Sequence, residues 1–284
     1  VIGHSVSDIQ NIDNRKNNVM INSVKRLIPH HLLFPYVEEY TLRKIRIDKG
    51  ESIEKLMPHR MQTSIEFFLA TPHKKFDLQT GQEKSTLTST ARGFRTFSKY
   101  KIHISGNFLS LTVKFRPSGM YGLLGVPLNH LTNEDTSLKE LDILPVQEIE
   151  NRLLEASHEN EYCTILDEYL LQLYQQQTFN MRLQPFLTSK KVDFLTIADI
   201  AMELGVSARQ AERIFLNEVG ISFIKWQQLK KFDTAIKYKI KHPETSWTDL
   251  ALLFNFYDQP HFNKAFKKYL GITPSDFNSS DFAF

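Results

Sequence analysis

Three charged side chains fall on one face of a helix predicted for residues 207–218, near the C-terminal end of the chain. They are Arg209, Glu212 and Arg213. An arginine can bridge O6 and N7 of guanine, and a glutamate can accept a hydrogen bond from N4 of cytosine. We therefore predict that these residues contact bases or phosphates. The alternative is that each is an ordinary solvated surface charge.

A second helix, predicted for residues 258–269, presents a comparable face. Its candidate residues are Gln259, His261, Asn263, Lys264, Lys267 and Lys268. Glutamine and asparagine suit adenine, and lysine suits guanine or a phosphate. The last two lysines are predicted to lie next to phosphates, where they would position a protein on DNA without reading its sequence. Here too the alternative is a solvated surface.

The two helices belong to a repeat. The segments RIFLNEVGIS (213–222) and KAFKKYLGIT (264–273) share a phenylalanine and a Gly-Ile pair at an offset of 51 residues. The repeat extends upstream, where Thr196-Ile-Ala-Asp199 and Ser246-Trp-Thr-Asp249 each place a hydroxyl three residues before an acid. This spacing is typical of a capping box at the start of a helix.

Each copy then continues with residues that end one helix and start the next. The predicted helix ends are Gly205 and Asn255, the next N-caps are Ser207 and Asp258, and the final C-caps are Gly220 and Gly271. Both copies therefore read as helix, tight turn, helix. The helix that follows is predicted to start at Ser222 in the first copy and at Thr273-Pro274 in the second.

The spacing between the copies favours DNA binding over a generic helical hairpin repeat. Solenoid repeats are contiguous and need more than two copies, whereas one long helix over about 222–241 separates these two. Such a helix is roughly 30 Å long. Two helix-turn-helix units that read one face of a duplex lie about 34 Å apart. The pattern thus predicts two recognition helices on one spacer.

The region 179–277 resembles the DNA-binding domain of AraC-type transcriptional regulators. The resemblance rests on TIADIAMELGVS, RIFLNEVGIS and SWTDLALLFNFYDQPHFNKAFKKYLGITPSDF. It implies an all-α domain, placed here at 179–278, with two helix-turn-helix units joined by a long helix. It also implies that Arg209, Glu212 and Arg213 are base contacts.

The N-terminal half is predicted to be rich in β-strands. Strands are expected at 40–47, 64–70 and 74–79, and a hairpin at 100–104 and 107–115 that turns at Ser105-Gly106-Asn107. Short strands separated by turns indicate a small barrel or sandwich. Residues 115–138 resemble the sensor-like domain of some AraC-type regulators. The resemblance implies a cupin-like β-barrel with appended helices, here 20–177, as a sensing or dimerisation domain.

Helical spacing replaces strand alternation from about 147 to 177. One stripe of this region, Ile165, Tyr169, Leu170 and Leu173, is a candidate contact for a homodimer through the 147–177 helices. The alternative is that the stripe packs on its own barrel. The polar stretch QQQT at 175–178 is the candidate linker between the domains.

Composition excludes several other classes of protein. The net charge of +3 resides in residues 180–284, where 14 basic residues face 11 acidic ones. Cys163 is the sole cysteine, so no internal disulfide is expected. No apolar run is long enough to span a membrane, and the polar N-terminal stretch lacks the apolar core of a signal peptide. We expect a cytoplasmic protein with no membrane association.

Enzyme chemistry has little support in the sequence. His59 and His103 lack the His-x-His spacing of a metal-binding cupin, and no Gly-rich phosphate loop or catalytic triad is found. We expect no metal, no cofactor and no catalytic activity. Cys163 is expected to be packed in a helix rather than reactive.

These observations together predict a sequence-specific DNA-binding transcriptional regulator. The family resemblance implies an activator that binds promoter or operator DNA, contacts RNA polymerase and responds to a small-molecule effector. Two alternatives stay open. One is a protein-interaction adaptor that lacks DNA binding, and the other is a metal-dependent cupin enzyme with an accessory helical tail.

Overall fold

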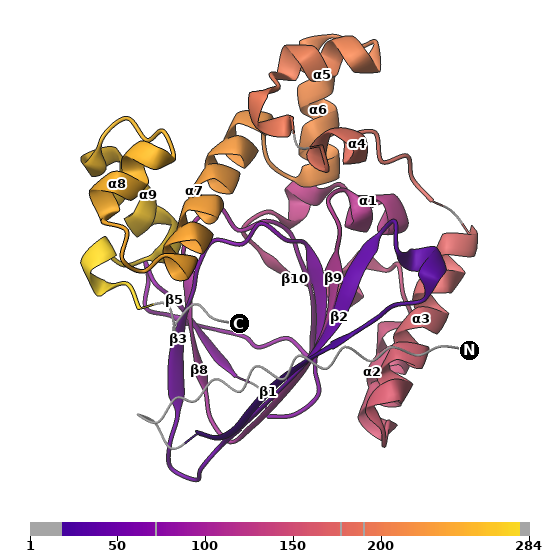
Figure 1. Ribbon diagram of the computed structural model, residues 1–284. Helices are drawn as coiled ribbons and strands as arrows, with labels where there is room; N and C mark the ends of the chain where they lie inside the picture. Colours follow the sequence, from indigo (N-terminus) through magenta and orange to yellow (C-terminus); the bar gives the residue numbers. More distant parts are fainter. Residues whose placement is uncertain (1–18, 72, 177, 190, 279–284) are drawn as a thin grey trace.

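A computed structural model describes residues 19–71, 73–176, 178–189 and 191–278. The polar N-terminal stretch and Gln177 of the predicted linker lie outside these ranges. A six-stranded antiparallel sheet forms one side of the N-terminal half (Figure 1). Its strands, in spatial order, are β1 (Val19–Leu27), β2 (Val37–Ile47), β9 (Asn107–Phe115), β4 (Ser64–Phe68), β7 (Ser89–Arg92) and β10 (Asp135–Ser137).

A second antiparallel sheet faces the first. It consists of β3 (Ile53–Met57), β8 (Tyr100–Ile104), β5 (Lys74–Asp77) and β6 (Glu83–Lys84). The two sheets enclose a common interior, as Figure 1 shows. The predicted β-barrel is therefore confirmed, and the strands expected at 40–47, 64–70 and 74–79 correspond to β2, β4 and β5.

The predicted hairpin between β8 and β9 is wrong. Both strands exist, but β8 pairs with β3 and β5, whereas β9 pairs with β2 and β4. The turn at Gly106, which has a φ of 67°, carries the chain from one sheet to the other. Strand alternation shows which face is apolar but not which strand is the partner, so the sequence alone could not separate these two arrangements.

The apolar face of the larger sheet is covered by helices. Leu111, Val113 and Phe115 of β9 point toward α1 (Gly119–Leu124), α2 (Val146–Glu155) and α3 (Glu159–Gln176), and all of these elements share one hydrophobic core. The opposite face of the same strand carries Ser110 and Thr112. This polar face points into the barrel interior, where Thr112 lines a cavity.

The apolar stripe of α3 is buried within the chain. Ile165, Tyr169 and Leu170 are at most 6% exposed and belong to the core beneath the larger sheet, and Leu173 packs against that core. The second of the two sequence interpretations is thus the one found. The stripe packs on its own domain and is not available as a dimer surface. Cys163 lies in the same helix, half-buried against this core.

The remainder of the described chain consists mainly of α-helices joined by turns. They are α4 (Gln184–Leu187), α5 (Ile197–Leu204), α6 (Ala208–Val219), α7 (Phe223–Lys241), α8 (Trp247–Leu253) and α9 (Gln259–Leu270). Figure 1 shows α5 and α6 at one end of α7, and α8 and α9 at the other. A second hydrophobic core holds them together and includes Phe94 of the barrel. Across the described ranges, no helix has both the length and the apolarity needed to cross a membrane.

Candidate nucleic-acid interface

The first helix-turn-helix unit is built from α5 and α6. The amide of Asp199 donates to the Thr196 hydroxyl at 3.2 Å, and the Asp199 carboxylate accepts from the Thr196 amide at 2.7 Å. Helix α5 ends at Gly205, whose φ is 65°. Ser207 then caps α6 by accepting from the amide of Gln210. The predicted caps and turn of the first unit are confirmed.

The second unit, α8 and α9, repeats this arrangement with small differences. Ser246 accepts from the amide of Asp249 at 3.1 Å, and its hydroxyl donates to the Asp249 carboxylate at 2.6 Å, as the Thr196 hydroxyl does to Asp199 at 2.7 Å. The full capping box, in which the carboxylate also accepts from the amide of the cap, is formed by Thr196 and Asp199 in the first unit. The turn contains Asn255 with a φ of 53°, in the left-handed region that asparagine tolerates. Asp258 caps α9 by accepting from the amide of His261 at 2.6 Å.

Helix α7 separates the two units and packs on both. It has 19 residues, which corresponds to a length of about 28 Å. Near its start, Trp226 contacts Phe215 of α6, with ring centroids 6.3 Å apart. Farther along, Phe232 contacts Phe266 of α9, with ring centroids 5.8 Å apart. The aromatic side chains therefore fix each recognition helix to the same rigid spacer.

The predicted contact residues of α6 lie on its outer face. Ala211 and Phe215 are fully buried, and Arg209 and Arg213 are exposed. Glu212 is only half-exposed. The structure brings the two arginines together on the surface of one recognition helix, as the sequence pattern requires, with the carboxylate beside them.

The predicted contact residues of α9 are also exposed, but they differ in their surroundings. Asn263 and Lys264 are exposed. The His261 ring lies 5.9 Å from that of Phe256, and Gln259 accepts from the Thr248 hydroxyl at 3.2 Å. Lys267 and Lys268 sit in the last turn of α9, at the end opposite the cap. The backbone carbonyl of Lys268 accepts from the Ser98 amide of the barrel, so this lysine lies at the junction with the N-terminal half.

The last turn of α6 packs tightly on the barrel at Gly220. The Thr132 hydroxyl donates to the Gly220 carbonyl at 2.7 Å. Gly220 has a φ of 95°, and a Cβ atom there would lie 2.7 Å from Thr132 Oγ1 and 2.8 Å from the Leu128 carbonyl oxygen. This position therefore needs glycine for two reasons, its backbone conformation and its close contact with the barrel.

The corresponding turn of α9 packs on another part of the barrel. A Cβ atom at Gly271 would lie 2.8 Å from Ser98 Oγ, and the φ of Gly271 is 82°. Next to it, the Tyr269 carbonyl accepts from the His59 amide at 2.7 Å. The same glycine of each repeat therefore contacts the N-terminal half, Gly220 at Thr132 and Gly271 at Ser98.

Glu218 is a structural residue that the sequence analysis did not identify. It is 2% exposed, and its carboxylate accepts from the amides of Arg182 and Leu183 at 3.1 and 3.0 Å. Burial raises the pKa of this carboxyl. The sequence feature that could have identified it is its helical spacing from Ala211 and Phe215. This spacing places Glu218 on the buried face of α6, where a charged residue needs a specific partner.

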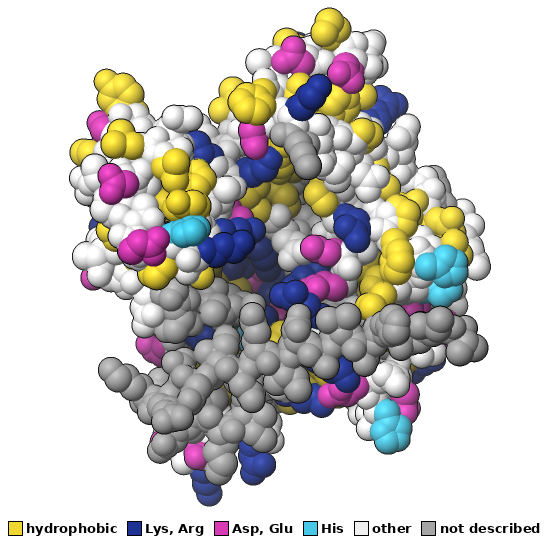
Figure 2. Space-filling view, in the orientation of Figure 1, with side chains coloured by type: hydrophobic (Ala, Val, Ile, Leu, Met, Phe, Trp, Pro, Cys, Tyr) yellow, Lys and Arg dark blue, Asp and Glu magenta, His cyan; other side chains and the backbone are white. Residues whose placement is uncertain are grey.

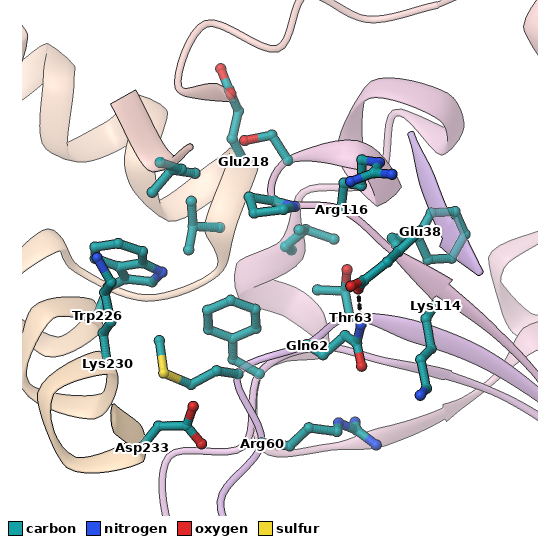
Figure 3. A pocket seen from close by; sticks show the side chains of 18 of the residues that line it. Glu38, Arg60, Gln62, Thr63, Lys114, Arg116, Glu218, Trp226, Lys230 and Asp233 are labelled. Atoms are coloured by element: carbon teal, nitrogen blue, oxygen red, sulfur yellow. Dashed lines mark hydrogen bonds between the residues drawn. The ribbon is translucent and has the colours of Figure 1, made fainter. Parts of the chain in front are cut away.

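A cleft of about 610 Å³ lies between the barrel and the helices (Figure 3). Barrel residues on one wall include Arg60, Gln62 and Lys114, and the other wall includes Trp226 and Lys230 of α7. Figure 2 shows Lys and Arg side chains gathered around this hollow. The part of the chain that the structure describes contains no group of three or more His, Cys, Asp or Glu side chains placed to hold a metal ion.

The fold and this site define a two-domain protein, with a sheet-rich domain followed by a double helix-turn-helix domain. Residues 200–280 match a family described as a helix-turn-helix domain. The HTH-type transcriptional activator AarP of Providencia stuartii is 32% identical over 87 residues, which are 31% of this chain and 64% of AarP. The C-terminal part of the chain is therefore a helix-turn-helix domain.

Solved structures that match this chain include ToxT from Vibrio cholerae. One ToxT structure is 13% identical with a TM-score of 0.42, and the match covers 84% of this chain and 96% of ToxT. A second, of ToxT bound to (E)-4-(8-methylnaphthalen-1-yl)but-3-enoic acid, is 12% identical with a TM-score of 0.44 and covers 86% of this chain and 100% of ToxT.

Proposed function

We propose that this chain is a sequence-specific regulator of transcription that binds double-stranded DNA through α6 and α9. The observation that carries the proposal is the pair of capped helix-turn-helix units at the two ends of α7. A spacer of about 28 Å, with a helix packed across each end, suits two successive major grooves on one face of a duplex.

The chemistry of the exposed faces supports the same function. Arg209 and Arg213 on α6 offer bidentate donors for guanine, and Asn263 and Lys264 on α9 offer donors for adenine, guanine or phosphate. Glu212 is the least favourable member of the set, because a carboxylate near phosphates is repelled unless a base donor compensates it. Lys267 and Lys268 would contact phosphates only if the DNA extends toward the barrel.

We assign the two functions to the two parts of the chain. Residues 20–177 would sense a small-molecule effector and 179–278 would bind DNA. The name of AarP favours an activator, which would act by contacting RNA polymerase near a promoter in the cytoplasm. A homodimer, if it forms through the 147–177 helices, would have to use surfaces other than the buried stripe of α3. No catalytic step is proposed.

Binding to a fluorescent pool of genomic fragments, measured across a salt series, tests the function. Wild type should select specific fragments, and log Kd should change linearly with log salt concentration, because phosphate contacts release counterions. Arg213→Ala should weaken binding to the preferred fragment by about 1–3 kcal/mol, roughly 5- to 150-fold, and relax its sequence preference. Arg46→Ala is the matched control, since Arg46 is an exposed arginine at the end of β2, in the barrel and outside the helical domain.

The outcomes separate the proposal from its rivals. Selective binding that Arg213→Ala reduces and Arg46→Ala leaves intact supports the proposal. Salt-insensitive binding, or equal losses in the two variants, contradicts direct reading by α6. If wild type shows no selective binding at low salt, with or without anions added as described below, the adaptor function becomes the better interpretation.

A further inference from the structure

The barrel interior contains a cavity of about 300 Å³ that the DNA-binding function does not use. Its lining comes from the inner faces of β2, β4, β7 and β9, together with residues of the opposite sheet. A volume of this size is at the lower end of the range for small-molecule sites. The cavity is therefore large enough for a compact ligand.

Two buried carboxylates stand at the centre of an ion-pair network in this interior. Glu66 pairs with Arg92, and Asp135 pairs with Lys75, Arg92 and Arg95 at 2.9, 3.2 and 3.1 Å. Burial alone would raise the pKa of Asp135, but Arg92, Arg95 and Lys75 hold it far below its usual range. Both carboxylates are thus already neutralised by the protein.

Two further guanidinium groups face the same cavity. Arg43 and Arg60 line it. Even without Arg43, the described side chains of the network and its lining include Arg60, Arg92, Arg95 and Lys75 against two carboxylates. Arg60 donates to the Gly93 carbonyl at 3.1 Å. At the rim, the charge of Lys114 is offset by Glu39 at 2.7 Å. The interior therefore carries an excess of positive charge.

This excess is unfavourable in an empty cavity. Burial, with the nearby charges of Arg95 and Arg92, lowers the pKa of Arg60. Within the described part of the chain, the buried Nε atoms of Arg60 and Arg95 have no hydrogen-bond partner. Buried donors normally find an acceptor, and a buried charge that lacks one is strongly destabilising. An anion in the cavity would supply both the charge and the acceptors.

The rest of the lining restricts the shape of such a ligand. Phe68, Phe108, Ile102 and Leu56 form an apolar wall, so a small hydrocarbon body fits beside the charged groups. We propose that the barrel binds a compact organic or inorganic anion that carries two negative charges, such as a short dicarboxylate or a phosphate. Arg60 and Arg95 would be its principal hydrogen-bond donors.

The position of Arg60 connects this site to the DNA-binding helices. Arg60 and Lys114 line both the barrel cavity and the cleft beside α7. The preceding residue, His59, donates its amide to Tyr269 of α9, and its ring lies 5.3 Å from that of Phe232 of α7. An anion held by Arg60 would therefore shift the conformational equilibrium of the segment at His59 and Arg60, which contacts α9. This role as effector site rests on the proposed regulatory function.

Thermal unfolding and calorimetric titration of the full chain test the inference. The probes are potassium succinate and potassium phosphate, compared with acetate, oleate and potassium chloride at equal ionic strength. A dianion should raise the unfolding midpoint by several degrees above the chloride control, because binding only to the folded state stabilises it. Arg60→Gln should weaken dianion binding by about tenfold or more, and the exposed-site control Arg46→Gln should not.

Arg60→Lys is a second variant that controls for misfolding, because it keeps the positive charge and removes only the planar fork of donors. It should weaken binding severalfold while leaving the circular dichroism spectrum unchanged. The inference is overturned if neither dianion stabilises the protein beyond chloride, if acetate or oleate binds as tightly, or if binding survives Arg60→Gln. Parallel DNA titrations keep the two proposals distinct. Anion binding without selective DNA binding refutes only the regulator, and the converse refutes only the anion site.

Discussion

Replacing Gly220 with alanine should destabilise the helical domain more than the same change at Gly205. Both glycines have a positive φ, 95° and 65°, so each alanine is strained by about 1–2 kcal/mol. A Cβ atom at Gly205 meets nothing within 4 Å. A Cβ atom at Gly220 lies 2.7 Å from Thr132 Oγ1 and 2.8 Å from the Leu128 carbonyl oxygen.

The two variants should differ in their free energy of unfolding because only the Cβ atom at position 220 is in close contact with the barrel. Overpacking of this kind costs about 1–3 kcal/mol. The total loss for Gly220→Ala is then about 2–5 kcal/mol, against about 1–2 kcal/mol for Gly205→Ala. The backbone carbonyl of Leu128 cannot rotate away as a flexible side chain could, so we expect little relief by local adjustment.

Urea unfolding followed by tryptophan fluorescence measures this difference. The two tryptophans are Trp226 in α7 and Trp247 in α8, so their emission reports on the helical domain. With an m-value of about 1–3 kcal/mol/M, the midpoint for Gly220→Ala should fall by about 1 M more than that for Gly205→Ala. Equal midpoints would refute the argument that the last turn of α6 is pressed against the barrel.

Two further predictions concern the N-terminal half. Leu170→Ala should lower the free energy of unfolding by about 2–5 kcal/mol, because the side chain is 2% exposed in the core, and it should leave the mass measured by light scattering unchanged. A change in mass without loss of stability would contradict the assignment of this stripe to the core. Asp135→Asn should destabilise the barrel by about 3–5 kcal/mol, because it leaves Arg92, Arg95 and Lys75 without their shared partner. The depressed pKa of Asp135 stabilises the folded state above the usual aspartate range, and this contribution is lost as the pH falls, so acid titration of the variant should show a shallower loss of stability than wild type.

The double helix-turn-helix could be predicted from sequence because its signals are local. A cap such as Thr196 and its partner Asp199 are three residues apart, and Gly205 and Gly220 mark helix ends by their own conformation. The stripe of Ala211 and Phe215 recurs at helical spacing. Each of these features can be recognised without knowing what the rest of the chain does.

The barrel was harder to predict because its organisation depends on contacts between distant segments. One of the two partners of β9 is β2, about sixty or more residues earlier in the chain. The charged interior joins Arg43, Glu66, Arg92 and Asp135, which come from four different strands. Each of these residues alone resembles a surface charge in an alternating strand. Only the closure of the barrel shows that this polar face points inward.

The Gly220 and Gly271 contacts have a thermodynamic consequence. Both recognition helices end against the same barrel, so the distance between them is set by the barrel as well as by α7. If an anion changes the affinity for DNA by some factor, linkage requires DNA to change the affinity for the anion by the same factor. Titrating the anion in the presence and absence of the preferred fragment would therefore measure, from the ligand's side, how strongly the two sites are coupled.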